Sequence, residues 1–393
     1  MMAAMDARQA AQAAVQEAQD RLVSLSHRIH AHPELAFEEV HACEWVAAEL
    51  DAAGLAVRTG AGDLPTALVA EAGDGPLTIA VCAEYDALPE VGHACGHNVI
   101  AAAAVGAGIA LARVADDVGL RVRVIGTPAE EAGGGKILLL QAGVFDGVHA
   151  AMMVHPFPYE REGMPCLAVA HLEVEYHGRA AHASVHPEDG VNAADALTVA
   201  QVAIGLLRQH LRPNDRVHGI VTLGGGAPNV VPAHTTGRWY ARSATLAELE
   251  DLKPRVRACF DAGALATGCR LTFHDDPRPY SEFRVDDALA GLYRRNAEAL
   301  GRHFTEPGGP ADRMLGSTDM ANVSLAIPSI HPMVDIDARP YSNHQPEFAA
   351  CCIRPAADRA VVDGAVAMAW TAIDAALDAS MSARLRGGPS LAT

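Results

Sequence analysis

The sequence predicts an α/β protein whose mainly parallel sheet is flanked by helices and is interrupted by a second, inserted α+β domain. Up to about residue 166, buried strand-like segments alternate with helical ones, which is typical of a parallel sheet covered by helices. After that point the strands alternate polar and apolar residues, as half-exposed antiparallel strands do. Helical spacing returns from about residue 283, so the first domain is predicted to be split in sequence.

The elements of the first region are predicted from hydrophobic periodicity. Apolar residues recur at helical spacing over residues 10–29 and 40–50. Buried strands are predicted within PLTIAVCAEYDALP (76–89), LRVRVIGTPAEE (120–131) and VHAAMMVHPFP (148–158). Between them, the segments 98–115 and 133–145 are predicted to form helices. The first of these is rich in small residues, so it can pack closely on a sheet.

The inserted region is predicted to contain four strands and two helices. The strands lie at 166–178, 217–226, 235–245 and 269–276, and the helices at 190–211 and 246–264. Beyond it, a buried strand is predicted at 326–337 and a long helix at 346–378. The simplest division assigns residues 1–170 and 282–393 to one domain and residues 171–281 to an insertion, a kind of insertion that surface loops tolerate well.

Composition limits the class of protein. The chain has 393 residues, 50% of them hydrophobic, and a formal net charge of -18. Such an acidic chain repels phosphate backbones, so no nucleic-acid partner is expected. The 8 cysteines form no regular framework, which favours free thiols in a reducing cytosol. The polar N-terminus does not resemble a signal peptide, and the Ala-rich run at 99–112 contains glycines and is too short and too weakly apolar to span a bilayer. We expect a cytoplasmic protein without a membrane partner.

Polar side chains follow each of the three early strands, where sites form in open parallel sheets. In chain order these residues are Glu84, Asp86, His93, Cys95, His97, Glu130, Glu131 and His155, and the segment YSNHQPEF later adds His344. Each has an ordinary structural explanation when taken alone. Their clustering at strand ends is what points to a site.

The residue types in this set suit zinc or a similar divalent ion. The set is too large for one catalytic ion with an open position, but it fits two ions about 3.5–4 Å apart that share one ligand. Of the adjacent glutamates, one can bind metal while the other acts as a general base on a water molecule. Asp86 can orient a ligand from behind.

Two other motifs are weaker. The segment AGGGKI resembles a phosphate-binding loop, but Glu130 stands at its first glycine position and Ile137 replaces the required Ser or Thr. The segment HACGH is not a Cys-x-x-Cys redox motif.

Two alternatives to a metal-dependent enzyme stay open at this point. A cysteine hydrolase using Cys95 and His97 is one, although residues two apart are poorly placed to pair. That alternative also leaves Glu131, His155 and His344 unexplained. The other alternative is a non-catalytic binding or scaffold protein on the same fold, and its mark would be missing metal ligands.

Several segments together resemble a known family. They are HRIHAHPELAFEE, CAEYDALPEVGHACGHN, GTPAEEAGGGK, VHP, HGRAAHAS, GGAPNVVP, STDMANVS and NHQPEF, in this order. The set is similar to the co-catalytic metallopeptidase family of aminoacylases and glutamate carboxypeptidases. Within it, the chain resembles the amidohydrolases that act on indoleacetyl-amino acids, hippurate and aminobenzoyl-glutamate, and the β-alanyl-lysine dipeptidase-like members.

The resemblance implies a zinc-exopeptidase-like catalytic domain with an inserted ferredoxin-like lid that forms a homodimer. It also implies two divalent ions per subunit, zinc or manganese, with cobalt possible in vitro. The residues that match the metal ligands, with Cys95 as the bridge, are Cys95, His97, Glu131, His155 and His344.

The resemblance assigns the remaining roles as follows. Glu130 matches the general base and Asp86 the aspartate that orients a ligand. On the lid, His182 matches a residue that reaches the substrate carbonyl. Asn229 and Arg242 match positions that hold the substrate carbonyl and carboxylate, and arginine grips a carboxylate through two parallel hydrogen bonds.

Departures from the family pattern favour one branch. Asn98 stands where many relatives have Asp. The acidic-x-Asp pair of the family reads EYD here, at residues 84–86, and the SEDF segment of many relatives is replaced by STDM at residues 317–320. These differences favour the aminobenzoyl-glutamate and dipeptidase-like branch. The expected activity is metal-dependent hydrolysis of the amide that joins an acyl or aminoacyl group to an amino acid with a free carboxylate. The roles of His93 and Asn98 stay open.

Overall fold

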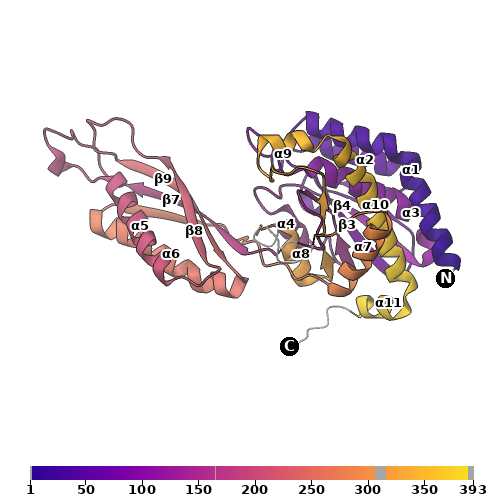
Figure 1. Cartoon of the computed structure of the whole chain (residues 1–393). Helices are drawn as coiled ribbons and strands as arrows, with labels where there is room; N and C mark the ends of the chain where they lie inside the picture. Colours follow the sequence, from indigo (N-terminus) through magenta and orange to yellow (C-terminus); the bar gives the residue numbers. More distant parts are fainter. Residues whose placement is uncertain (1, 164, 306–315, 388–393) are drawn as a thin grey trace. The chain divides into compact units, whose positions relative to one another are not determined.

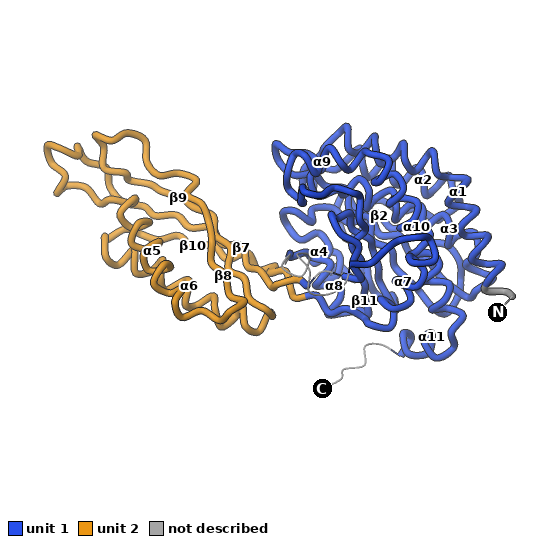
Figure 2. The backbone as a smooth tube through the Cα atoms, in the orientation of Figure 1, with its two compact units in different colours: residues 1–165, 283–393 blue, residues 166–282 orange. Residues whose placement is uncertain are grey.

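The computed structural model describes residues 2–163, 165–305 and 316–387 and divides the chain into two compact units (Figure 2). Unit 1 comprises residues 1–165 and 283–393, and unit 2 comprises residues 166–282. The predicted boundary at 170/171 lies inside strand β7 (Ala168–His177), and the one at 281/282 shifts by a single residue. Because a strand belongs to the sheet with which it pairs, the first boundary falls before β7 and not within it.

Unit 1 is built on a six-stranded sheet with the order β1-β2-β4-β3-β5-β11. In chain order its strands are β1 (Ala56–Thr59), β2 (Leu68–Ala72), β3 (Leu77–Glu84), β4 (Leu120–Thr127), β5 (Ala150–Met152) and β11 (Ser329–Ile330). The pairs β3–β4, β3–β5 and β5–β11 are parallel, whereas β1 and β2 add an antiparallel edge. The predicted mainly parallel sheet is confirmed, although β1 and β2 are not among the predicted elements.

Helices cover both faces of this sheet (Figure 1). In chain order they are α1 (Met2–Ala31), α2 (Val40–Ala52), the 3-10 helix η1 (Ala61–Asp63), α3 (His97–Val118), α4 (Gly135–Gln141), α7 (Asp287–Ala299), α8 (Met320–Ala326), α9 (Pro346–Cys351), α10 (Pro355–Leu377) and α11 (Ala379–Arg386). Along β3, Ile79 and Val81 join a core with α1, α3 and α10, while Ala80 and Cys82 join a second core with α4 and α8. This alternation is the period of two expected for a strand buried on both faces.

Two helices of unit 1, α3 and α10, are long and apolar enough to cross a membrane by length and composition. Within the unit, 83% of the apolar stretch of α3 and 67% of that of α10 is buried. Both helices pack against α1 and against each other. Their apolar composition is therefore explained by the core that they form.

Two strands and one helix predicted as single elements are each divided, so these predictions were wrong in detail. Residues 148–158 form β5 in the large sheet and β6 (His155–Phe157), which pairs in parallel with β12 (Met333–Asp335). The strand predicted at 326–337 is divided in the same way into β11 and β12. The helix predicted over 346–378 is divided into α9 and α10, because Pro355 lacks an amide donor and disfavours a helical residue before it.

Unit 2 has a four-stranded antiparallel sheet with the order β10-β7-β9-β8. After β7, its elements are η2 (Pro187–Asp189), α5 (Ala193–Leu207), η3 (Arg208–His210), β8 (Arg216–Leu223), β9 (His234–Ser243), α6 (Leu246–Thr267) and β10 (Arg270–Asp275). The sequence β-α-β-β-α-β is the connectivity of ferredoxin-like folds. The predicted inserted α+β domain is confirmed.

The two faces of the unit 2 sheet differ. Buried and more exposed residues alternate along β9. Trp239 and Ala241 pack into a core with side chains of α5 and α6. The residues between and after them, Tyr240 and Arg242, therefore project from the opposite face of the sheet.

Candidate metal centre

Five of the predicted site residues form two overlapping groups beyond the ends of β3, β4 and β5. One group is Cys95, His97 and His155, and the other is Cys95, Glu131 and His344. Within each group, the atoms that could bind a metal lie within 4.8 Å of one another. Cys95 belongs to both groups, so the structure brings all five residues together around its thiol.

Cys95 and His97 are positioned by the turn that leads into α3. Gly96, between them, has a φ of 85°, and a Cβ at this position would lie only 2.4 Å from Cγ of Pro156. Glycine is therefore the residue that this turn accepts. His97 follows as the first, fully buried residue of α3.

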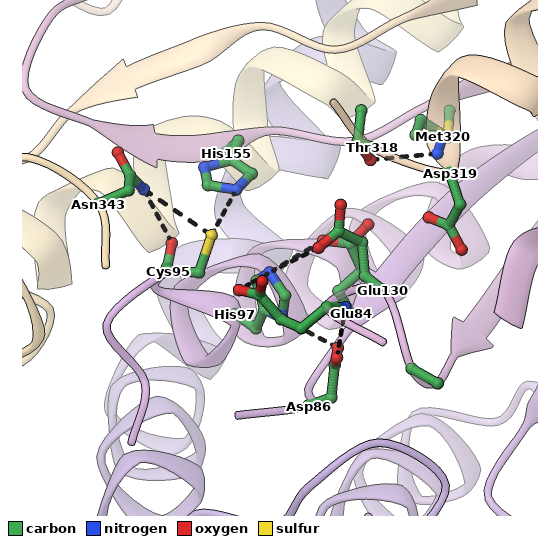
Figure 3. A network of polar contacts seen from close by, with 12 residues as sticks. Glu84, Asp86, Cys95, His97, Glu130, His155, Thr318, Asp319, Met320 and Asn343 are labelled. Atoms are coloured by element: carbon green, nitrogen blue, oxygen red, sulfur yellow. Dashed lines mark hydrogen bonds and ion pairs between the residues drawn. The ribbon is translucent and has the colours of Figure 1, made fainter. Parts of the chain in front are cut away.

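His97 is oriented by Asp86 (Figure 3). Its Nδ1 lies 3.0 Å from Oδ1 of Asp86, so a proton on Nδ1 is donated to the carboxylate. Its Nε2 faces the carboxylates of Glu84, Glu130 and Glu131, at 3.5, 3.8 and 3.9 Å. Asp86 also accepts the backbone N–H of Glu131 at 2.9 Å. Although burial raises it, the neighbouring His97 holds the pKa of Asp86 below its usual value.

The Nε2 atom of the His155 ring faces the Cys95 thiol (Figure 3). Nε2 of His155 lies 3.4 Å from Sγ of Cys95, and Nδ1 lies 2.8 Å from the carbonyl oxygen of Pro156. The proton therefore belongs on Nδ1, where it is donated to the carbonyl. Burial, and then the nearby His97, lower the pKa of His155 to about 4. The ring is neutral near pH 7, as a metal ligand must be.

His344 comes from the loop before α9, far along the chain. Its backbone N–H donates to the carbonyl of Ala94 at 2.8 Å, and the Asn343 side chain donates to the carbonyl of Cys95 at 3.3 Å. Nε2 of His344 lies 3.6 Å from Oε1 of Glu131. The φ of His344 is 71°, which is uncommon for a residue other than glycine. Such a constrained backbone is typical of functional positions.

Buried polar atoms test whether this set fits metal ions. Among the described residues, Nε2 of His97 and Oε1 of Glu131 are buried and have no hydrogen-bond partner. An unpaired buried polar group costs about 1–3 kcal/mol. Nitrogen, sulfur and carboxylate donors at these distances suit zinc and related ions. The residues present therefore fit divalent ions.

The Cys95 thiol is poorly suited to act alone as a nucleophile. Burial, and then the carboxylate of Glu131, raise its pKa well above the usual value. A reactive thiol needs a lowered pKa, and a bound divalent cation deprotonates a coordinating thiol outright. These surroundings favour a ligand role over the cysteine-hydrolase alternative.

A buried ion network beside Glu130 is missing from the predicted site. Nζ of Lys136 lies 2.5 Å from Oε1 of Glu84 and 2.7 Å from Oδ1 of Asp319, and all three side chains are fully buried. Oxygen atoms of Glu84, Glu130 and Asp319 lie within 4.8 Å of one another. Although burial lowers it, Asp319 and Glu84 raise the pKa of Lys136 above its usual value. Its ammonium group is thus the cation of this carboxylate cluster.

The two residues whose roles the sequence leaves open face the protein interior. Nδ2 of Asn98 donates to Oγ of Ser26 at 2.8 Å and to the carbonyl of Cys352 at 3.0 Å. Asn98 therefore ties α3 to α1 and to the end of α9. His93 is buried, and burial followed by the nearby His97 lowers its pKa to about 3. The centroid of the neutral His93 ring lies 6.1 Å from that of the His30 ring.

The three predicted substrate residues lie in unit 2. The segments of His182 and Asn229 are joined by a hydrogen bond of 3.0 Å from the Ala183 N–H to the Asn229 carbonyl. Both side chains are exposed. Arg242 lies on β9, where its Nε donates to Nε2 of His218 at 3.2 Å. The structure thus brings His182 and Asn229 together and places Arg242 on the sheet.

Comparisons with known proteins place the chain in a family. Residues 80–359 match the family described as Peptidase family M20/M25/M40. A mouse Xaa-Arg dipeptidase is 39% identical over 375 residues, covering 92% of this chain and 86% of that protein. One subunit of the p-aminobenzoyl-glutamate hydrolase of Escherichia coli is 34% identical over 277 residues, covering 65% of this chain and 57% of that protein.

Solved structures share the fold. A dinuclear metal-binding peptidase of family M20 from Bacillus subtilis has a TM-score of 0.68 and 22% identity, covering 91% of this chain and 98% of that one. An aminobenzoyl-glutamate utilization protein from Klebsiella pneumoniae has a TM-score of 0.66 and 20% identity, covering 88% and 96%. With the family match and the relatives above, the chain is a metal-dependent amidohydrolase that belongs to peptidase family M20/M25/M40.

Proposed function

We propose that unit 1 binds two divalent metal ions that share Cys95. The observation that carries this proposal is the pair of ligand groups that overlap only at Cys95. His97 and His155 complete one group, and Glu131 and His344 complete the other. A shared ligand is typical of co-catalytic ions about 3.5–4 Å apart. The mixed nitrogen, sulfur and oxygen donors suit zinc or manganese, with cobalt as a replacement in vitro.

The proposed substrate is an N-acyl or aminoacyl amino acid with a free carboxylate. The names of the mouse and Escherichia coli relatives both denote an amide bond to an amino acid. Arg242 offers a guanidinium group for the carboxylate. His182 and Asn229 offer hydrogen-bond donors for the carbonyl of the scissile bond.

A pocket next to Glu131 suits the side chain of such a substrate. It has a volume of about 290 Å³ and is lined by Leu35, Ala36, Glu38, Ala87, Leu88, Pro89, Glu131 and Ala132. An apolar wall with the Glu38 carboxylate in it fits a side chain with an apolar stem and a cationic end. Glu38→Gln is expected to raise KM for an arginine-containing dipeptide more than for a neutral one. Equal effects on both dipeptides would contradict this assignment.

Glu130 is the proposed proton carrier. When bound, the two ions would polarise the scissile carbonyl and acidify a water molecule. The Glu130 carboxylate would accept a proton from the attacking water and donate it to the leaving nitrogen. Burial and the carboxylates of Glu84 and Glu131 raise the pKa of Glu130 well above its usual value. Between the two transfers the proton would stay on the Glu130 carboxyl group, while Asp86 keeps His97 oriented.

The variant Glu130→Gln tests this role. It preserves the shape of the side chain but removes the base, so it is expected to retain both metal ions and to lose about 10²–10⁴-fold in kcat. Metal content by elemental analysis and initial rates with zinc, manganese and cobalt are the measurements. Glu71→Gln, at a partly exposed ion pair with Arg123, is the matched control. A Glu130→Gln enzyme with the wild-type rate would overturn the assignment.

We also propose that the chain forms a homodimer through unit 2 and works in the cytoplasm. Apolar side chains are exposed on α5 and on the edge strand β8, with Leu206 at 71%, Val202 at 58% and Ile220 at 63%. Covering such side chains favours association with a second copy. All eight cysteines are buried free thiols, as in a reducing compartment. Leu206→Glu is expected to yield monomers in light scattering.

A further inference from the structure

Three side chains of unit 2 form a cluster outside the predicted centre. Glu175 and His177 stand two residues apart on β7, so they project from the same face of the sheet. His234, on β9, is directly opposite His177 in the antiparallel register. Potential metal-binding atoms of all three lie within 4.8 Å of one another.

The distances within this cluster match those around a tetrahedral ion. Oε2 of Glu175 lies 3.3 Å from Nε2 of His177 and 3.3 Å from Nε2 of His234. With zinc–nitrogen and zinc–oxygen bonds of about 2.0–2.2 Å, neighbouring ligands of a tetrahedral zinc ion lie about 3.3–3.5 Å apart. Both Nε2 atoms therefore lie at such a ligand-to-ligand distance from the same oxygen, Oε2 of Glu175.

The backbone places the two histidines side by side. Their rings are stacked, with centroids 4.9 Å apart and planes 10° from parallel, so the rings have to turn about their side-chain bonds before both Nε2 lone pairs, which lie in the ring planes, point to one ion. The ladder between β7 and β9 continues beyond them, because the Gly178 N–H donates to the carbonyl of Ala233 at 2.8 Å. Side-chain exposures of 45% for Glu175, 32% for His177 and 44% for His234 leave the cluster open to a hydrated ion.

We propose that Glu175, His177 and His234 form an additional binding site for a divalent transition-metal ion of the zinc class. Two imidazoles and one carboxylate supply three ligands, and water completes the coordination. The site uses no residue of unit 1 and no thiol. It is therefore separate from the proposed catalytic pair of ions, and it can be removed without changing any residue of the catalytic centre.

The test is the zinc stoichiometry of the full-length holoenzyme. The protein is dialysed to equilibrium against zinc ions, and zinc per chain is measured by elemental analysis. The wild type is expected to bind one zinc equivalent more than the double variant His177→Gln/His234→Gln. The matched control is His274→Gln, an exposed histidine on the neighbouring strand β10, which is expected to keep that equivalent.

Either of two results would overturn the proposal. One is equal zinc binding by the wild type and the double variant. The other is loss of the same equivalent in His274→Gln, which would indicate unspecific binding to surface histidines. Circular dichroism shows whether each variant is folded. As a second readout, zinc is expected to raise the Tm of the wild type more than that of the double variant, since a ligand that binds only the folded state stabilises it.

Discussion

The two units carry histidine and carboxylate clusters of similar composition in different surroundings. In unit 1, Cys95 and His97 are buried, and Nε2 of His97 has no hydrogen-bond partner among the described residues. In unit 2, His177 and His234 are partly exposed. Water can satisfy an exposed cluster, but only a ligand or another side chain can satisfy a buried one. A buried cluster without hydrogen-bond partners is therefore stronger evidence of a binding site than an exposed cluster. For the exposed cluster of unit 2, the evidence is the distances between the three side chains.

The largest expected effect is found by comparing a buried histidine of unit 1 with an exposed histidine of unit 2. His97→Ala removes a buried ligand and is expected to abolish metal binding and to lower kcat/KM by more than about 10³-fold, since the ions supply several kcal/mol of transition-state stabilisation. His182→Ala, in unit 2, is expected to keep the metals and to lose about 10²–10³-fold, as removal of a single carbonyl-stabilising donor does. Metal content and kcat/KM of both variants are the measurements. Metal loss in His182→Ala would contradict this division of roles.

Ion pairs allow a second comparison between the units, at the level of folding stability. Lys136→Met leaves Glu84 and Asp319 buried without their cation, which is expected to lower the free energy of unfolding by about 3–5 kcal/mol. Lys253, on α6, pairs with Asp275 at 2.8 Å but keeps 20% of its side chain exposed. Lys253→Met is expected to cost less than about 1 kcal/mol.

Urea unfolding of the two lysine variants, with the metal content held constant, measures the difference. The metals must be controlled because a ligand that binds only the folded protein adds to its stability. Equal costs for Lys136→Met and Lys253→Met would show that the buried network contributes no more than a partly exposed pair.

Much of the fold can be predicted because periodicity is a local property. Residues 98–115 are expected to be helical and are part of α3, and the alternation in 166–178 gives β7. The division of residues 148–158 cannot be predicted in this way. Apart from its two histidines the segment is apolar, and nothing within it shows that Met152 pairs in one sheet and His155 in another. Pairing partners are set by distant segments.

The same limit explains what the sequence shows of the site. Cys95, His97 and Glu131 could be grouped because ligand types follow strand ends. Lys136 could not be grouped with them, because it stands in a glycine-rich segment and its partner Asp319 is 183 positions away. Only the folded chain shows that its ammonium group lies between two buried carboxylates.

A third and smaller effect tests the hydrogen bond by which Asp86 orients the buried ligand His97. Asp86→Asn keeps the size of the side chain that accepts from Nδ1 of His97, but it removes the negative charge. Metal affinity is expected to fall about 10–100-fold, as for other partners that orient a ligating histidine. Competition with a chelator measures this affinity. Asp276→Asn in unit 2, whose partner is Arg278, is expected to leave the affinity unchanged. An equal loss in both variants would rule out a specific role for Asp86.

The smallest effect concerns Arg242 in unit 2, which is half-buried on β9. Arg242→Lys keeps the positive charge but removes the planar fork that grips a carboxylate. KM for a dipeptide is expected to rise about tenfold, which corresponds to about 1.4 kcal/mol. Arg238→Lys, four residues before Arg242 on β9 and 3.3 Å from Glu173, is the matched control and is expected to change KM little.

A dipeptide amide sharpens the Arg242 experiment because it lacks the carboxylate. If Arg242 binds that carboxylate, Arg242→Lys raises KM for the acid but not for the amide. A rise of the same size for both substrates would instead indicate that Arg242 shapes unit 2 through its contacts with His218 and Tyr240. The ratio of the two KM values therefore separates recognition from structure at Arg242, a half-buried residue whose burial alone does not show its role.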